Sequence, residues 1–466
     1  MSESHLTMTT SAEEYRARRA RLAALIRRPL VILAGHAPAR NYATNPYPFR
    51  AASTYLYFGG PPVEHAAMII EPSSDGDDGC TLCRPAPGAD DPLWLGETPS
   101  DGILADASGI AWPRIVDCDA AEPLLAGRKA AGIVPPYPRS IARAERLGLD
   151  APTEEEMLAI INMRLIKDAG EIAAMRQAAD AGIDAHRAAM SATVVGRTED
   201  DVEAALTGAL VRHRCRPSFS SIVTMRGEVL HGASAGRKLT PGALMLVDAG
   251  AEASTGYASD ITRTFPVSGE WTPIQRQLYD TVLRAEREAI AACLPGRRYR
   301  EVHTIAARCI TAGLIEAELL RGDVDDLTER GVYTLFFPHG VGHLLGLDVH
   351  DMEDFGDLAG YAPGRQRPER FGDCFLRLDR DLAPGMVVTI EPGIYLVPAI
   401  WRRDDLVGPF ADAVNRPAVD ALLADAFGGI RIEDDVHVRD ASSGGPEVLT
   451  AALPVGADEV AGLVGA

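Results

Sequence analysis

The sequence is short of cysteine, of basic residues and of long apolar runs, and each shortage excludes a class of protein. Seven cysteines are spread over 466 residues, an odd and sparse number that favours reduced thiols over a disulfide framework. Cys80 and Cys83 form a lone CxxC pair, which does not supply the four ligands of a structural zinc. We therefore expect inert thiols and a cytoplasmic protein.

Acidic residues outnumber basic ones by 66 to 46, which gives a formal net charge of -20. Nucleic acids and anionic membranes attract basic surfaces, so neither is an expected partner. No apolar run reaches the roughly 18 residues of a membrane span, and the first residues lack the apolar stretch of a signal peptide. Residues 15–28 are basic and amphipathic but follow the acidic SAEEY, so we expect a first domain helix there rather than a targeting segment.

The first third of the chain has the pattern of a mixed α/β domain. Residues 29–35 and 66–72 are apolar and strand-like, and the aromatic run at 53–60 (STYLYFGG) predicts a strand that enters a turn. Residues 73–102 are rich in Gly, Pro and Asp and predict mostly loop. Neither GxGxxG nor GxxxxGK[ST] occurs, so the sequence has no nucleotide fingerprint.

The pattern becomes helical near residues 155–165, and we place a domain boundary there, with domains at 1–158 and 159–466. Asp168 is a candidate N-cap, with Glu171 as its capping-box partner. The remaining pattern predicts these elements: helices from Thr198, over 273–293, over 300–320 and within 401–427, and strands within 218–232, 382–398 and 427–438.

Residues 244–266 predict a β-hairpin, because two apolar strands flank a turn rich in Gly and Ser. Asp248 lies at the end of one strand and Asp260 at the start of the other, and antiparallel pairing can bring them side by side. Two buried carboxylates at that distance repel each other, so one takes a proton or a cation lies between them. The alternative is two ordinary turn aspartates.

Three more polar groups lie in apolar surroundings at strand or turn ends: His343, Glu391 and Glu433. Carboxylates are costly to bury there unless they are paired or bound to metal. With Asp248 and Asp260 they make a set of four carboxylates and one imidazole, which suits Mn²⁺ or Mg²⁺ and also admits Co²⁺, Zn²⁺ or Fe²⁺. Two divalent cations balance the charge of four carboxylates, so the set indicates a two-metal centre.

His339 precedes His343 by four residues in HGVGH. On a helix this spacing would resemble a zinc-binding pair, but Gly340 and Gly342 disfavour a helix. His339 is therefore either an ordinary loop histidine or a polar group that serves the site.

Ordered motifs in the second part of the chain carry a family resemblance: DAG…SDITRTFP, HGVGHLLGLDVHD, LAPGMVVTIEPGIY and GGIRIEDDV. Together they resemble the metallopeptidases of the aminopeptidase P and prolidase group, over about residues 160–445. YPFRAASTYLYFGG is similar, more weakly, to the aminopeptidase P N-terminal domain. The resemblance implies an α/β N-terminal domain followed by an α+β catalytic domain with the creatinase-type pita-bread fold.

The resemblance also assigns roles to individual residues of this sequence. It implies that two metal ions, Mn²⁺ in the first instance, are held by Asp248, Asp260, His343, Glu391 and Glu433. It places accessory histidines that bind substrate or transfer protons at His231, His339 and His350. Glu391, or a group near it, would take the proton of the nucleophile, and Arg431 would support the site.

One departure from the family pattern concerns the hairpin. The two aspartates are 12 residues apart here, whereas the family usually has 11. The extra residue falls in the turn at 253–256, so we expect the strands to stay in register. Within a strand, the same extra residue would turn Asp260 to the wrong face.

The activity that the resemblance implies is hydrolysis of the bond before a proline at the second position of a peptide, by a homodimeric or homotetrameric Xaa-Pro aminopeptidase. A prolidase, which takes dipeptides, is the first alternative. FLRLDRDLAPGM resembles the prolidase form, whose arginine, Arg377 here, binds the dipeptide carboxylate, and residues 401–426 also look like prolidase. The other interpretation pairs Arg377 with a nearby acid, such as Asp373 or Asp379.

Two further classes fit less well. Pita-bread proteins that only bind partners have lost metal ligands, whereas the five-residue set is intact here. Methionine aminopeptidases lack so large an N-terminal domain.

Overall fold

The computed structural model describes residue 6 and residues 8–42, 44–94 and 96–466. The chain folds into two compact units, Met1–Leu165 and Ile166–Ala466. Helix α7 (Glu154–Leu165) ends the first unit. The boundary after residue 158 stays a prediction, and it lies within this helix.

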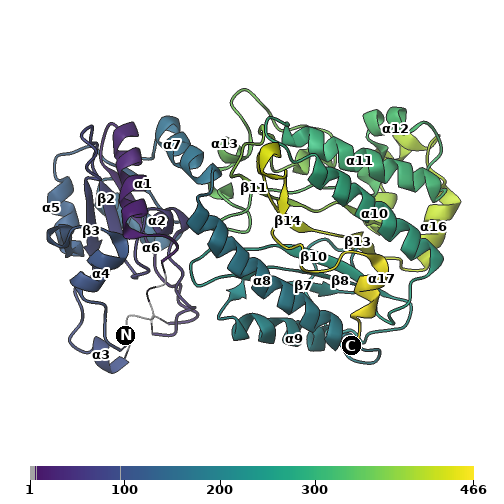
Figure 1. Ribbon diagram of the computed structural model, residues 1–466, viewed down its shortest axis with the longest axis horizontal. Coiled ribbons are helices and arrows are strands. Elements are labelled where there is room, and N and C mark those ends of the chain that lie inside the picture. The colour runs from purple at the N-terminus through teal and green to yellow at the C-terminus, as the bar shows by residue number, and fades with distance from the viewer. Residues whose placement is uncertain (1–5, 7, 43, 95) are drawn as a thin grey trace. The chain divides into compact units, whose positions relative to one another are not determined.

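The first unit is built on a five-stranded mixed sheet in the order β4-β3-β2-β1-β5 (Figure 1). Its strands are β1 (Leu30–Leu33), β2 (Ala67–Ile70), β3 (Cys80–Arg84), β4 (Ile115–Asp117) and β5 (Ala131–Ile133). The three central strands pair antiparallel and the two outer ones parallel. The helices are α1 (Ala12–Leu25), α2 (Ser53–Tyr57), α3 (Asp91–Trp94), α4 (Asp101–Ser108), α5 (Ala121–Leu125), α6 (Pro138–Arg146) and α7.

The predicted aromatic strand at 53–60 is wrong, because this segment contains helix α2. Tyr55 and Tyr57 are buried, and aromatic residues favour strands only where a pleated surface receives them. Gly60 then ends the segment against the Tyr55 ring, where a Cβ would lie 2.2 Å from a ring carbon. Packing onto the sheet of the first unit therefore decides the conformation, not the residue types.

The CxxC pair lies in β3, within the stretch that the composition predicts to be mostly loop. Cys80 and Cys83 are fully buried in the sheet, and this burial raises the pKa of each thiol to about 12. All seven cysteines are free thiols. The pair is therefore protonated and unreactive at neutral pH.

The second unit contains four small antiparallel sheets, β10-β8-β7, β11-β14-β15, β12-β13 and β6-β9. The strands are β6 (Arg216–Pro217), β7 (Ile222–Thr224), β8 (Leu244–Ala249), β9 (Ala251–Glu252), β10 (Ile261–Pro266), β11 (Val387–Ile390), β12 (Gly393–Tyr395), β13 (Gly429–Arg431), β14 (Asp434–His437) and β15 (Glu447–Val448). Single bridges link the sheets, including Thr262↔Glu433 and Leu344↔Val388.

Two long helix pairs pack on these strands (Figure 1). Helices α8 (Ala169–Ala192) and α9 (Glu199–Arg212) form one pair, and α8 contacts β8 and β10. Helices α10 (Pro273–Ala291) and α11 (Tyr299–Glu316) form the other, and α10 contacts β11, β12 and β13. The remaining helices are α12 (Val324–Arg330), α13 (Asp357–Gly360), α14 (Pro398–Trp401), α15 (Asp404–Val407), α16 (Arg416–Ala424) and α17 (Ala457–Gly462).

The helix starts follow the sequence signals. Asp168 and Glu171 form the predicted capping box of α8, and Thr198 is the N-cap of α9.

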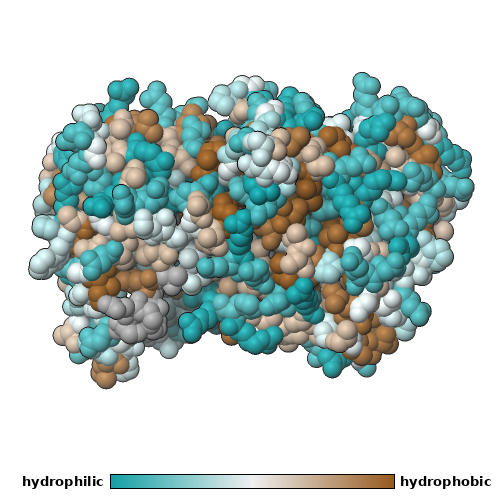
Figure 2. Space-filling model, viewed as in Figure 1, coloured by the Kyte–Doolittle hydropathy of each residue, from teal (hydrophilic) through white to brown (hydrophobic). Residues whose placement is uncertain are grey.

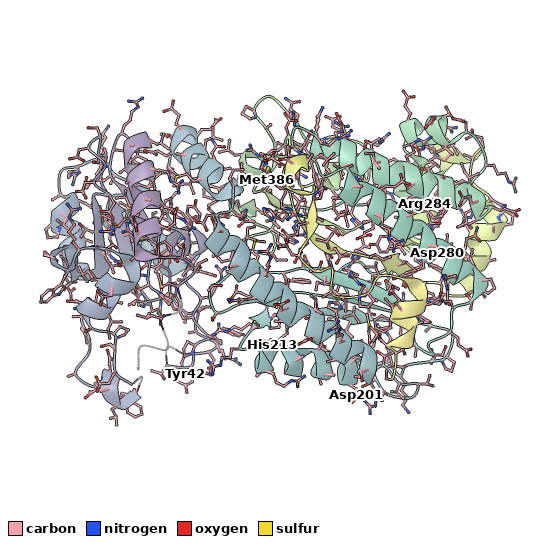
Figure 3. All side chains as sticks on the ribbon, in the orientation of Figure 1. Tyr42, Asp201, His213, Asp280, Arg284 and Met386 are labelled. Atoms are coloured by element: carbon pink, nitrogen blue, oxygen red, sulfur yellow. The ribbon has the colours of Figure 1, made fainter. Side chains whose placement is uncertain are left out.

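Asp280 and Arg284 lie on α10 (Figure 3), where Asp280 pairs with Arg276 and Arg284 pairs with Glu316. The face seen in Figure 2 mixes hydrophilic residues with small hydrophobic patches. Among the described residues, no helix combines the length and the apolar character needed to cross a membrane.

Candidate metal centre

The predicted hairpin is present, and its register sets the geometry of the two aspartates. Strands β8 and β10 pair antiparallel with Asp248 opposite Thr262. The bridge between Glu252 and Ala258 continues the same register toward the tip, so the extra residue lies in the turn, as expected. Asp260 precedes Thr262 by two positions, so the carboxylates of Asp248 and Asp260 are diagonal neighbours on one face.

His343 and Glu391 are brought together by two antiparallel segments. The Thr389 N–H donates to the His343 carbonyl at 3.0 Å, and the Glu391 N–H donates to the Val341 carbonyl at 2.8 Å. Gly342 makes this approach feasible, because a Cβ there would lie 2.2 Å from the Thr389 carbonyl oxygen.

Glu433 lies in the short connection between β13 and β14. Its N–H donates to the Thr262 carbonyl at 3.0 Å, and the Thr262 hydroxyl donates to Glu433 Oε2 at 2.8 Å. Glu433 is thereby fixed beside Asp260, although the two are far apart in the sequence.

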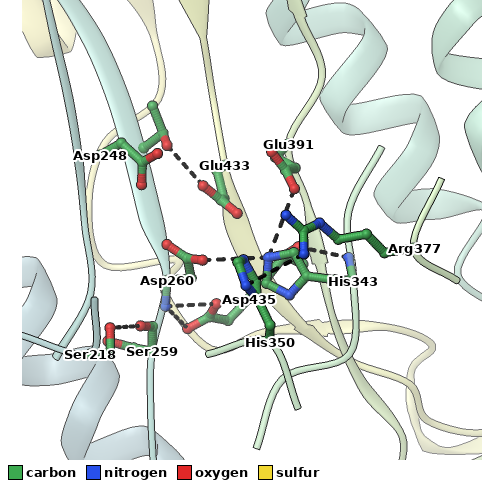
Figure 4. A network of polar contacts seen from close by, with 12 residues as sticks. Ser218, Asp248, Ser259, Asp260, His343, His350, Arg377, Glu391, Glu433 and Asp435 are labelled. Carbon is green, nitrogen blue, oxygen red and sulfur yellow. Dashed lines mark hydrogen bonds and ion pairs between the residues drawn. The ribbon is translucent and has the colours of Figure 1, made fainter. Parts of the chain in front are cut away.

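The five predicted ligands converge on one buried space (Figure 4). Ligand atoms of Asp260, His343 and Glu433 all lie within 4.8 Å of one another. His343 Nε2 is 3.5 Å from Asp260 Oδ2 and 3.8 Å from Glu391 Oε1. The carboxylates of Asp260 and Glu433, held within 4.8 Å of each other, require a proton or a cation between them.

The buried oxygens test whether a cation fits here. Asp248 Oδ1 and Asp260 Oδ1 are buried and have no hydrogen-bond partner in the described part of the chain. Burial and the neighbouring carboxylates raise the pKa of Asp260 and Glu433 well above the usual range, and burial raises the pKa of Glu391 to about 7. Divalent cations would satisfy these oxygens and keep them ionised, so the residues present fit a metal centre.

His343 has the protonation state and the tautomer that a metal-binding histidine needs. Its Nδ1–H donates to the Leu344 carbonyl at 3.0 Å, which leaves Nε2 facing Asp260 and Glu391. Burial lowers the pKa of His343, so the ring is neutral at pH 7. Metal-binding histidines generally donate their other ring N–H to such an acceptor, and this hydrogen bond orients the ring.

Arg431 is buried behind the carboxylates and anchors one of them. It pairs with Asp248 Oδ2 at 2.5 Å and donates to the Tyr395 hydroxyl at 2.8 Å and to Thr262 Oγ1 at 3.2 Å. Sequence reasoning missed Thr262 and Tyr395. Signals existed for both, since Thr262 shares the face of Asp260 by strand alternation and Tyr395 ends the EPGIY motif.

The three predicted accessory histidines all line the same cavity, whose volume is about 940 Å³. His339 Nε2 accepts from the Tyr395 hydroxyl at 2.9 Å, and His339 Nδ1 lies 3.7 Å from Glu391 Oε2. Burial and Arg431 lower the pKa of His339 to about 3. His231 lies on the cavity wall and is more exposed than the other two.

His350 stands edge-on to His343, with ring centres 4.5 Å apart. Burial, the His343 ring and Arg377 lower its pKa to about 2, so it is neutral at pH 7. A neutral imidazole at this position can accept a proton on one nitrogen and release one from the other.

Arg377 also lines the cavity and pairs with a nearby acid, as the alternative interpretation expects, but that acid is neither Asp373 nor Asp379. Its Nη1 lies 2.6 Å from both carboxylate oxygens of Glu353 and 3.5 Å from His350 Nδ1. Asp373 instead pairs with Arg370, and Asp379 pairs with Arg298. The chain places a third acid, Glu353, beside Arg377 through the turn after His350, a contact that local sequence does not indicate.

Comparisons with known proteins match both parts of the chain. Residues 173–440 match the sequence model of metallopeptidase family M24, and residues 15–122 match that of the aminopeptidase P N-terminal domain. Xaa-Pro aminopeptidase 2 of Streptomyces coelicolor is 31% identical over 455 residues, covering 92% of this chain and 86% of that protein. The Xaa-Pro aminopeptidase of Escherichia coli K12 is 30% identical over 444 residues, covering 91% and 90%.

Solved structures of aminopeptidase P are also similar to this chain. Aminopeptidase PepP of Pseudomonas aeruginosa has a TM-score of 0.78 at 29% identity, covering 98% of this chain and 99% of that one. Aminopeptidase P of E. coli with the inhibitor Pro-Leu has a TM-score of 0.77 at 28% identity, covering 98% of each chain.

Proposed function

The chain belongs to metallopeptidase family M24, and we propose that its reaction uses two divalent cations held by Asp248, Asp260, His343, Glu391 and Glu433. An aminopeptidase P N-terminal domain precedes a catalytic domain of pita-bread fold, as the sequence predicts. The protein is a metallopeptidase that hydrolyses the bond between the N-terminal residue of a peptide and a following proline. The dipeptidase alternative is not favoured, because the named relatives are Xaa-Pro aminopeptidases.

One observation carries the metal assignment, namely the convergence of Asp260, His343 and Glu433 beside buried carboxylate oxygens that have no hydrogen-bond partner among the described residues. The chain binds divalent metal, and we assign Mn²⁺ because four carboxylates and one imidazole form a predominantly hard, oxygen-rich ligand set. Co²⁺, Zn²⁺ or Fe²⁺ would also fit this set. The similar E. coli enzyme has been described in a Zn-substituted form.

Bound divalent cations would acidify a water molecule and polarise the substrate carbonyl. Glu391, itself one of the five ligands, has one oxygen facing His343 and the other facing His339. It is therefore placed to take the proton of the attacking water. Arg431 holds Asp248 by a buried ion pair, so that the carboxylate keeps one orientation through the reaction.

The histidines act around this centre. His350 would relay to the leaving proline nitrogen the proton that Glu391 takes from the water, since its neutral ring can accept a proton on one nitrogen while it releases one from the other. His339, fixed by the Tyr395 hydroxyl, and His231, on the cavity wall, bind the substrate backbone. An Xaa-Pro bond has no N–H, so an apolar wall must receive the proline ring instead. Apolar residues of the cavity can supply it: Phe219, Ile222, Leu230, Phe371, Phe375, Val397 and Ile400.

Arg377 keeps its proposed place in substrate binding, at the rim beside Glu353. A guanidinium pairs well with a free carboxylate, so Arg377 would improve the binding of short substrates whose C-terminus reaches it. Such a carboxylate must compete with Glu353 for the same guanidinium.

The biological setting follows from the same family membership. Peptides with proline at the second position are the substrates, and the -20 charge gives no reason to expect nucleic acid or anionic membrane as partners. We propose a homodimer or homotetramer, which light scattering at micromolar concentration would refute if it found a monomer. Seven free thiols support the cytoplasmic location expected from the sequence.

The test is to measure metal content and activity on the same preparation. We expect two metal ions per chain and hydrolysis of peptides with proline second, but not of matched peptides with alanine second. A preparation without bound metal and without peptidase activity would favour a binding protein of the same fold.

A further inference from the structure

Lys167 and Asp351 form an ion pair in the interior of the second unit. Lys167 Nζ lies 3.0 Å from Asp351 Oδ2, and the two side chains are only 1% and 2% exposed. Asp351 also lines the cavity of the metal centre. A buried ion pair is costly to desolvate and adds little stability over an apolar pair of the same size, so stability alone does not account for it.

Asp351 builds the turn that follows His343. Its N–H donates to the Leu344 carbonyl at 3.0 Å. Its carboxylate packs directly on Gly346, where a Cβ would lie 2.4 Å from Asp351 Oδ2. The Gly346 carbonyl in turn accepts from the Ala258 N–H at 2.9 Å. The carboxylate of Asp351 therefore lies inside a turn that joins the His343 segment to the hairpin of Asp260.

Lys167 reaches a second ligand-bearing segment through its backbone. Its N–H donates to the Gly385 carbonyl at 2.8 Å, and Gly385, at φ +89°, makes the turn that enters β11. Strand β11 ends one residue before Glu391. Lys167 therefore contacts two segments. Its backbone binds the turn that leads to Glu391, and its ammonium group binds the turn after His343.

We propose that Lys167, acting through Asp351, is a positioning residue for His350. The inference rests on the proton-transfer role proposed for His350, which directly precedes Asp351. The next residue, Met352, has φ +63°, a left-handed conformation that non-glycine residues rarely adopt. The ion pair holds this strained turn in place, and so keeps the His350 ring edge-on to His343.

The test removes both charges at once, so that neither is left buried alone. In the variant Lys167→Met/Asp351→Asn, we expect kcat for a peptide with proline second to fall at least tenfold. KM should stay within threefold and two metal ions per chain should be retained. Lys167→Arg, which keeps the charge, should retain at least half of the native kcat.

A matched control is the Arg28–Glu156 pair of the first unit, at 2.9 Å. Arg28→Met/Glu156→Gln removes a more exposed ion pair, 22% and 8% exposed, whose residues do not line the cavity, and we expect less than a twofold change in kcat. A tenfold loss in this control would mean that removing any such pair impairs the enzyme, and would overturn the proposal.

The decisive measurement repeats the Lys167/Asp351 variant in a His350→Ala background. Residues that act through one another are not additive, so we expect less than a twofold further loss there. An equal loss in both backgrounds, or no loss in the native background, overturns the proposal. If the pair has no effect while His350→Ala alone lowers kcat strongly, only this inference fails and the proposed function of His350 stands.

Discussion

Buried charged side chains in the two units, Arg19 in the first and two aspartates in the second, are satisfied differently. In the first unit, Arg19 is fully buried and pairs with Asp78 at 2.7 Å. It also donates to the carbonyls of Phe58 and Ser108, each at 2.9 Å. In the second unit, Asp248 and Asp260 are buried with oxygens that have no partner among the described residues.

The difference separates a structural charge from a functional one. Arg19 meets an opposite charge and backbone acceptors, so nothing further is needed to stabilise it. The carboxylates of the second unit meet mainly each other, although Asp248 has a buried cation, Arg431, at hydrogen-bond distance. Burial alone therefore does not indicate a site, whereas buried like charges with unused oxygens do, because they stay ionised only with a bound cation and must otherwise take up protons.

The strongest test of this contrast removes one carboxylate from each unit. Asp260→Ala or Glu433→Ala should abolish activity and lower the metal content per chain, because each side chain supplies a ligand oxygen. Asp78→Ala should lower stability by about 3–5 kcal/mol, since it leaves Arg19 buried without its counter-charge. It should nevertheless keep the metal and the turnover. Near-normal turnover with full metal content in Asp260→Ala would contradict the assignment.

A second test separates proton transfer from metal binding within the second unit. His350→Ala should lower kcat about 10²-fold and leave both metal ions bound, as expected of a proton-transfer group. His213→Ala, which removes a surface histidine paired with Asp184 at 2.9 Å, should change neither quantity. Loss of metal from His350→Ala would make His350 a ligand instead.

A third and smaller effect concerns Arg377, whose charge, like that of Arg19, already has a carboxylate partner. If it also binds substrate, Arg377→Ala should raise KM for Xaa-Pro dipeptides tenfold or more, about 1.4 kcal/mol, with little effect on longer peptides. Glu353→Gln should lower the dipeptide KM, since it frees the guanidinium. Equal losses on both substrates, or none on dipeptides, would remove Arg377 from substrate recognition.

The smallest expected effect is on the thermal stability of the metal-free protein. Without metal, burial raises the pKa of Glu391 from 4.5 to about 7. Between these values the folded state binds a proton that the unfolded state releases, so stability falls as pH rises. We expect the Tm of the metal-free second unit to drop by roughly 5 °C between pH 5 and pH 8, and added Mn²⁺ to reverse the drop. Glu391→Gln should weaken this dependence without removing it, because the pKa values of Asp260 and Glu433 are also raised.

Local signals were sufficient for much of the fold. The strands at Leu30–Leu33 and Ala67–Ile70, the capping box of Asp168 and the hairpin around Asp248 follow from short-range patterns. They succeed because the hydrogen bonds involved join neighbours in the sequence, or because an apolar run admits few other conformations.

Contacts between segments that are distant in the sequence could not be predicted from local patterns. Helix α2 forms where aromatic residues suggest a strand, because its buried tyrosines pack onto the sheet of the first unit instead of joining it. Glu353 forms an ion pair with Arg377, and Lys167 with Asp351, because turns bring distant segments together. The ligand set could be assembled from polar groups in apolar strand ends and was supported by motif resemblance, but no spacing rule places Glu433 beside Asp260.

The hairpin register has a consequence for natural variation of this gene. The pairing of Asp248 with Thr262 and of Glu252 with Ala258 keeps one register from the metal ligands almost to the tip at 253–257. Codons gained or lost at the tip leave both aspartates facing the cations, whereas one codon gained on either flank would rotate a ligand to the opposite face. Loop length between the aspartates can therefore drift among related genes, and an alignment gap at the tip says nothing against metal binding.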